Sequence, residues 1–154
     1  MKKLYLLLIP VFALLITGCG GSSKGNLQTM TCEISTTSNG IGLNAKYTIE
    51  HDGKYAKNAT FYEEYVSDDA NTLSQLETLV KNTYTTVDTA YGGYTIDVKK
   101  SDSKVVANIK VDYEKMNLAK AIENEESVKQ FTEDGKMSVE KMKSTYVSAG
   151  YTCK

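Results

Sequence analysis

The segment LNAKYTIEHDGKYAKNATFYEEY, residues 43–65, contains the pattern that decides the fold. Its first part alternates apolar and polar residues, which is typical of a half-buried β-strand. The pair Asp52-Gly53 then predicts a tight hairpin turn, and His51 before it is expected to be a solvated turn residue. A second alternating strand follows the turn. Its polar face includes Tyr62, and its apolar face is formed by Tyr55, Ala59, Phe61 and Tyr65.

More strands are predicted on both sides of this hairpin. Residues 30–36 alternate in the same way, and Asn39-Gly40 suits the positive φ angles of a type I′ turn into the strand that follows. Residues 94–99 and 105–113 also alternate. Five short strands with turn residues between most of them indicate an antiparallel sheet.

Helical periodicity replaces alternation in two regions. After Asp68-Asp69, whose side chains suit a helix N-cap, apolar residues recur at steps of three and four: Leu73, Leu76, Leu79, Val80, Tyr84 and Val87. A last helix is predicted from Ser138 to Gly150, and a short one lies near residues 118–122. We therefore expect a single α+β domain over residues 29–154, with an antiparallel sheet of about five strands and two to three helices packed on one face.

The N-terminal residues 1–18 resemble the signal peptide of a bacterial lipoprotein. Two lysines, Lys2 and Lys3, precede an apolar run over residues 4–16. This run is too short to span a bilayer, which needs about 20 helical residues, but it has the length of a signal-peptide core.

The end of this run decides how the protein is attached. Leu15-Ile16-Thr17-Gly18-Cys19 resembles the bacterial lipobox, which implies cleavage before Cys19 and a diacylglycerol on its sulfur. An ordinary secretory leader with a chance cysteine is the alternative. Residues 19–28 are then the lipidated cysteine and a flexible tether rich in Gly and Ser. We expect the domain to lie on the extracytoplasmic side of the cell membrane, held by lipid.

Removal of the leader changes the charge balance. The remaining 136 residues contain 16 Lys, 19 acidic residues and no Arg. Nucleic-acid binding depends on cations that neutralise phosphates, so no nucleic-acid partner is expected. Attraction to anionic lipid is not expected either, which leaves the lipid on Cys19 as the membrane attachment.

The other two cysteines, Cys32 and Cys153, form a candidate disulfide. They lie at opposite ends of the predicted domain, and export permits oxidation. Two free thiols, a reactive thiol pair and a pair of metal ligands are the alternatives. The chain has one histidine and no CxxC motif, so we expect no metal site.

The sequence contains no recognisable set of catalytic residues. We therefore expect no catalytic residue and no cofactor, and we expect that the protein is not an enzyme. There is no Gly-x-Ser-x-Gly motif. Glu63 and Glu64 are neighbours in a strand, so they point to opposite faces and cannot share a proton. Asp68-Asp69 is explained by helix capping, and Glu125-Glu126 by a solvated loop.

Tyrosine gives the stronger functional signal. Tyr62 lies on the predicted polar face, and Tyr91 and Tyr94 flank a Gly-Gly pair. Tyrosine is favoured at recognition surfaces because its ring covers area rigidly and its hydroxyl can hydrogen-bond. These three residues are the candidate binding residues. The alternative is that the tyrosines edge the core with their hydroxyls in water.

Three stretches resemble the YehR-like lipoprotein family, and together they extend over most of the chain after Cys19: KYTIEHDGK (46–54), VDYEKMNL (111–118) and MSVEKM (137–142) with AGY (149–151). The resemblance implies a small single-domain lipoprotein of the bacterial envelope without an assigned activity. The pair Cys32 and Cys153 is not part of that pattern.

The expected function is therefore that of a membrane-anchored lipoprotein, a non-catalytic binding module of the cell envelope. Candidate partners are an envelope protein, a peptide or a glycan. The alternatives are an accessory protein or enzyme that acts on envelope polymers, and a structural or stress-related envelope component.

Overall fold

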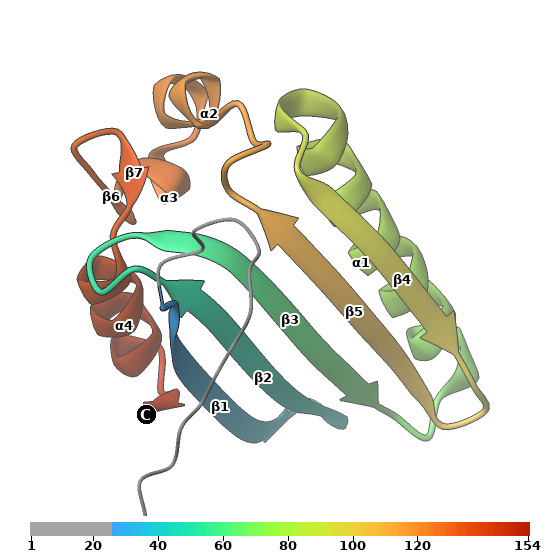
Figure 1. Cartoon of the computed structure of the whole chain (residues 1–154). Helices are drawn as coiled ribbons and strands as arrows, with labels where there is room; N and C mark the ends of the chain where they lie inside the picture. The colour runs from blue at the N-terminus through green and yellow to red at the C-terminus, as the bar shows by residue number, and fades with distance from the viewer. Residues whose placement is uncertain (1–25) are drawn as a thin grey trace, which may run out of the picture.

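The computed structural model describes residues 26–154, so the predicted signal peptide, Cys19 and residues 20–25 of the tether lie outside it. The described residues form a six-stranded antiparallel sheet in the order β4-β5-β3-β2-β1-β8, and β6 and β7 form a small second sheet. Four helices complete an α+β fold, which confirms the predicted class (Figure 1).

The first half of the sheet is the predicted meander of β1 (Gln28–Ser38), β2 (Ile41–His51) and β3 (Ala56–Val66). The first turn has the positive φ angles that Asn-Gly favours, 51° at Asn39 and 77° at Gly40.

The second turn differs from the prediction. Only Gly53 has a positive φ there, and the carboxylate of Asp52 accepts hydrogen bonds from the backbone N–H groups of Lys54 and Tyr55. The prediction of a solvated His51 was wrong. His51 is buried at the end of β2, and its Nδ1 accepts the N–H of Gly53 at 3.1 Å.

The second half of the sheet is the hairpin of β4 (Tyr94–Lys100) and β5 (Lys104–Asp112), which pairs with β3 through β5. At the other edge, the short β8 (Thr152–Cys153) pairs with β1.

Helix α1 (Ala70–Tyr91) contacts β3, β4 and β5. It begins at the predicted cap, where Asp69 accepts the N–H of Asn71 at 2.9 Å. Leu73 and Val80 are buried, but Leu79 is 62 % exposed, because residues one position apart on a helix are rotated by about 100°. Leu79 was therefore assigned to the wrong face.

The chain after β5 forms a series of short elements: α2 (Leu118–Asn124), α3 (Glu126–Lys129), β6 (Thr132–Glu133), β7 (Lys136–Met137) and α4 (Val139–Ser148). Ser138 caps α4, and Gly150 follows it with a φ of 94°.

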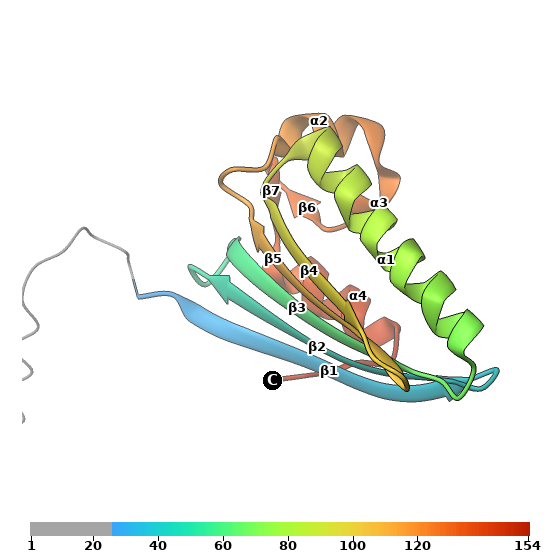
Figure 2. The same ribbon diagram turned by 90° about the vertical axis from the view of Figure 1, so that its right-hand side faces the viewer.

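All four helices lie on one side of the six-stranded sheet, as Figure 2 shows with the sheet seen nearly edge-on. The main core lies between the sheet and these helices, around Ile49, Val105, Ile109 and Met142. No helix of residues 26–154 covers the opposite face of the sheet, which is called the open face below. Within residues 26–154, every helix is too short or too polar to cross a membrane.

Candidate functional site

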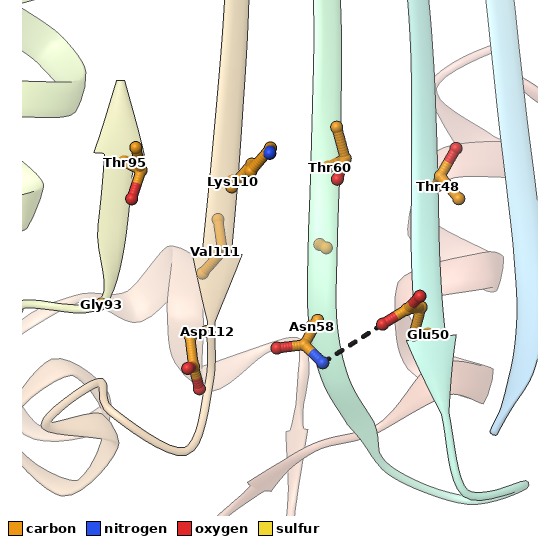
Figure 3. Close-up of a pocket in the computed structure, with 10 residues that line it drawn as sticks. Thr48, Glu50, Asn58, Thr60, Gly93, Thr95, Lys110, Val111 and Asp112 are labelled. Carbon is orange, nitrogen blue, oxygen red and sulfur yellow. Dashed lines mark hydrogen bonds between the residues drawn. The ribbon is translucent and has the colours of Figure 1, made fainter. Parts of the chain in front are cut away.

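Polar side chains run across the open face in straight rows. The strand register places Thr31, Thr48, Thr60, Lys110 and Thr95 opposite one another on five consecutive strands. Neighbouring strands are about 4.8 Å apart, so these side chains are regularly spaced. Four of the five are visible side by side in Figure 3. The next row is Glu33, Lys46, Tyr62, Asn108 and Asp97.

A shallow depression of about 300 Å³ lies over the first row on the open face, and it is lined by residues of β2, β3, β5 and β4 (Figure 3). Its polar lining comprises three threonine hydroxyls, one amide, one ammonium and two carboxylates, from Thr48, Thr60, Thr95, Asn58, Lys110, Glu50 and Asp112. This set contains hydrogen-bond donors, acceptors and groups that are both.

The two carboxylates in the depression are already engaged. Asn58 donates its side-chain N–H to Glu50 at 3.2 Å. Asp112 pairs with Lys115 at 2.8 Å, and this hydrogen bond lowers the pKa of Asp112 below its ordinary value. Neither carboxylate is placed as the free acid or base that a hydrolytic site requires.

Lysine charges elsewhere on the open face are paired with acids. Lys46 pairs with Glu33 at 3.0 Å, and Lys104 pairs with Glu64 at 2.8 Å. Lys110 differs, because it makes no ion pair with any of residues 26–154. Its ammonium, between Thr60 and Thr95 in the row, can therefore donate to a ligand.

The structure does not bring the three candidate tyrosines together. Tyr62 lies on the open face, and its hydroxyl donates to Glu64 at 3.2 Å. Tyr91 is buried at the end of α1 and donates to Glu125 at 2.9 Å. Tyr94 faces the core on the helix side. Of the three, only Tyr62 belongs to the open face.

Sequence reasoning missed a polar cluster in the core around Glu63, which is only 5 % exposed. Its carboxylate accepts the hydroxyls of Tyr47 at 2.9 Å, Tyr65 at 2.9 Å and Tyr84 at 2.8 Å. Burial raises the pKa of each of these tyrosines well above its usual value, and the negative charge of Glu63 raises it further. These residues are called the Glu63 cluster below.

A signal for this cluster is present in the sequence. Glu63 stands between Phe61 and Tyr65, so strand alternation places it on their face. Glu64 points the other way, to Lys104 and Asn44, which confirms that the two neighbouring carboxylates cannot share a proton.

The two remaining cysteines meet at the edge of the sheet. Cys32 of β1 lies directly opposite Cys153 of β8, with 4.0 Å between their Cα atoms and their sulfur atoms at bonding distance. The structure thus contains a disulfide-capable pair. No group of metal-ligating side chains occurs among residues 26–154.

Comparison with known proteins adds a family and two similar folds. A family model described as "Domain of unknown function (DUF8824)" matches residues 21–154. No curated protein matches the chain. Two solved structures, both determined by NMR, are similar in fold.

One of these structures is a protein from Streptococcus pneumoniae TIGR4, with a TM-score of 0.54 and 16 % identity, covering 100 % of this chain and 96 % of that one. The other is the YehR protein of E. coli, with a TM-score of 0.55 and 12 % identity, covering 84 % and 93 %. At these identities the likeness concerns the fold alone.

Proposed function

Because the chain belongs to the family described as "Domain of unknown function (DUF8824)", which names no activity, we propose a function from the geometry of the open face. The protein is a non-catalytic binding module that holds a glycan strand of the bacterial cell envelope. The observation that carries this proposal is the straight row of Thr31, Thr48, Thr60, Lys110 and Thr95 across five strands.

The chemistry of the open face favours a glycan over a protein partner. Protein interfaces have a core enriched in aromatic residues and depleted of charge. The two rows described above contain four threonines, four charged residues and one aromatic ring, that of Tyr62. Sugar hydroxyls both donate and accept hydrogen bonds, which matches threonine hydroxyls and the amide of Asn58.

Lys110 is expected to be the main polar contact. It lies between Thr60 and Thr95 in the row, and no ion pair within residues 26–154 occupies its ammonium. Tyr62, two residues along β3 from Thr60, offers a ring against which a sugar can pack.

Membrane attachment is part of the same proposal. The resemblance of residues 15–19 to a bacterial lipobox supports a lipid anchor on Cys19, with the domain at the extracytoplasmic side of the cell membrane. The three sequence stretches that resemble YehR-like lipoproteins support the same assignment. Mass spectrometry of the product should find a lipid mass that a Cys19→Ser variant lacks, and a wild-type product without lipid would contradict the anchor.

The glycan proposal is tested by binding of the purified protein to isolated cell-wall glycan and to soluble fragments of it. We expect Lys110→Ala and Thr60→Val each to weaken binding, Lys110→Ala by about tenfold, because hydrogen bonds to charged groups contribute about 1.5–3 kcal/mol. Lys143→Ala, on the exposed side of α4, is the matched control and should bind as the wild type does.

Two outcomes would contradict the proposal. Equal binding by Lys110→Ala, Thr60→Val and Lys143→Ala would remove the open face as the site. Cleavage of the glycan during the assay would favour the alternative of an enzyme that acts on envelope polymers.

A further inference from the structure

A second candidate site lies on the other side of the sheet, inside the fold. A cavity of about 150 Å³ lies between β3, β4 and the segment that runs from the end of β5 to α4. Five aromatic rings line it, those of Phe61, Tyr94, Tyr113, Phe131 and Tyr146, together with three methionines and a valine. None of the lining residues is charged. Methionine side chains are flexible and polarisable, so such a wall adapts to a small ligand.

Three hydroxyls of this wall have no hydrogen-bond partner among residues 26–154. Six tyrosines among residues 26–154 donate a hydrogen bond to a carboxylate. Tyr94, Tyr113 and Tyr146 make no such bond through their hydroxyls. Every fully enclosed side-chain nitrogen or oxygen of residues 26–154 has a hydrogen-bond partner. The three hydroxyl oxygens are therefore not fully enclosed.

A buried negative charge lies beside this cavity. Glu63 is on the same face of β3 as Phe61, and its carboxylate receives three tyrosine hydroxyls. An ionised carboxylate is an acceptor only, so three donors suit that state. No cationic side chain among residues 26–154 pairs with it.

The field of Glu63 reaches the cavity wall. The pKa of Tyr146 is raised by burial first, and then by neighbouring tyrosines and by the charge of Glu63. The ring of Tyr94 also lies 6.5 Å from the ring of Tyr84, which is bound to Glu63. The ring of Tyr146 also lies 5.3 Å from that of Tyr47, so rings of the Glu63 cluster neighbour rings of the cavity wall.

We propose that this cavity binds a small organic cation with methyl groups on its nitrogen, such as a quaternary ammonium group. The methyl groups pack against the rings, the positive charge is attracted by their π faces, and Glu63 balances the charge. An engineered cavity of about this size in another protein takes up benzene, so a ligand of similar size fits. An anion is disfavoured by Glu63, and a neutral ligand leaves its charge unbalanced.

The test compares two probes of similar size and different charge, tetramethylammonium and the neutral tert-butanol. Binding is followed in the purified protein by the NMR signals of the methyl groups of Met116, Met137 and Met142, which line the cavity. We expect these signals to shift with tetramethylammonium, and the cation to bind at least tenfold more tightly than tert-butanol. Equal affinity for the two probes, or no shift with the cation, would overturn the proposal.

Two variants examine the source of the preference. Glu63→Gln keeps the volume and removes the charge, so the preference for the cation should fall about tenfold. Phe131→Leu removes a ring that makes no hydrogen bond to Glu63 and keeps an apolar side chain, so it serves if Glu63→Gln does not fold. It should weaken cation binding severalfold and leave tert-butanol binding unchanged. An unchanged preference in a folded variant would contradict the assigned role of that residue and the proposal with it.

A quaternary ammonium group can be free or can be part of a lipid headgroup. Vesicles of phosphatidylcholine, added in place of the free ion, distinguish the two sources. The same methionine shifts with vesicles would assign the headgroup, and shifts with the free ion alone would assign a soluble ligand. This site lies on the opposite side of the sheet from Lys110, so its failure leaves the glycan proposal intact.

Discussion

The hydroxyl of Tyr84 donates a 2.8 Å hydrogen bond to the buried carboxylate of Glu63, and this contact joins helix α1 to strand β3 through the core. The two residues are 21 positions apart. Two further tyrosines donate to the same carboxylate, so one charged residue connects a helix and two strands.

Glu63→Ala should be strongly destabilising. It opens a cavity and leaves the hydroxyls of Tyr47, Tyr65 and Tyr84 without their acceptor, and each buried polar group left unpaired costs about 1–3 kcal/mol. Glu63→Gln keeps the volume and one acceptor oxygen and should cost less. Urea unfolding measures both. Glu50→Ala on the open face is the control, expected to change the unfolding free energy by less than about 0.5 kcal/mol. Equal effects of Glu63→Ala and Glu50→Ala would show that the cluster contributes no stability.

Stability should fall in alkaline solution because of the same tyrosines. Folding raises the pKa of Tyr47, Tyr65 and Tyr84, so the folded state favours their neutral form. This contribution is complete below the unfolded tyrosine pKa of about 10 and is lost as the pH rises above it, by about 1.4 kcal/mol per pH unit for each tyrosine. Urea unfolding at a series of pH values measures the slope.

Tyr84→Phe provides the control for this pH dependence. It removes one titrating group, so its stability should decline less steeply above pH 10 than that of the wild type. The ultraviolet absorbance of tyrosinate should rise together with unfolding for the remaining tyrosines of the cluster. Ionisation of all tyrosines in the native protein near their ordinary pKa would contradict this assignment.

The pair Cys32 and Cys153 should stabilise the domain when oxidised. A link between residues 121 apart in sequence restricts a long loop of the unfolded chain, and the loss of such links typically costs about 2–5 kcal/mol. We expect reduction and the double substitution Cys32→Ser/Cys153→Ser to lower the unfolding free energy by similar amounts. Intact mass spectrometry before and after reduction reports whether the bond is present. A protein that carries two free thiols after export and is insensitive to reductant would contradict the prediction.

Gly93→Ala should be more destabilising than Gly40→Ala. Both glycines have a positive φ, 87° and 77°, and this conformation costs a residue with a Cβ roughly 1–3 kcal/mol. At Gly40 the new Cβ would meet no atom within 4 Å, whereas at Gly93 it would lie 2.7 Å from the backbone oxygen of Asp112. The difference between the two variants in thermal unfolding temperature isolates the steric contribution to the loss of stability. Equal losses of stability would place the whole effect in the backbone angle.

The sheet could be predicted from the sequence because alternation is a local signal. Residues 43–49 alternate, and they form the centre of β2. Local turn preference was less reliable at Asp52-Gly53, where the turn is fixed by a side-chain acceptor instead of by positive φ angles at both residues. The helical pattern placed Leu79 on the wrong face. A helix buries only one stripe of its surface, and the choice of stripe depends on the sheet beneath it.

The sites were less predictable because they depend on contacts between distant residues. Alternation places Glu63 on the core face. The hydrogen bond that it accepts from Tyr84, 21 residues further along the chain in α1, cannot be inferred from the sequence of β3 alone. For the same reason, the sequence did not reveal that Tyr62, Tyr91 and Tyr94 lie apart in the fold. Their position beside Gly92-Gly93 suggested that Tyr91 and Tyr94 are exposed. In the structure Tyr91 is buried in a small hydrophobic cluster with Met116 and Ala121, and Tyr94 packs against the main core.

The place of β1 in the sheet determines how the domain would carry mechanical load. A pull on the residues before Gln28 acts along β1, so the hydrogen bonds to β2 are sheared together instead of being opened one by one. Cys32 and Cys153, once joined, give this tension a second, covalent route into β8 and the helix before it. A domain pulled at its N-terminal side would thus resist being drawn out from its first strand.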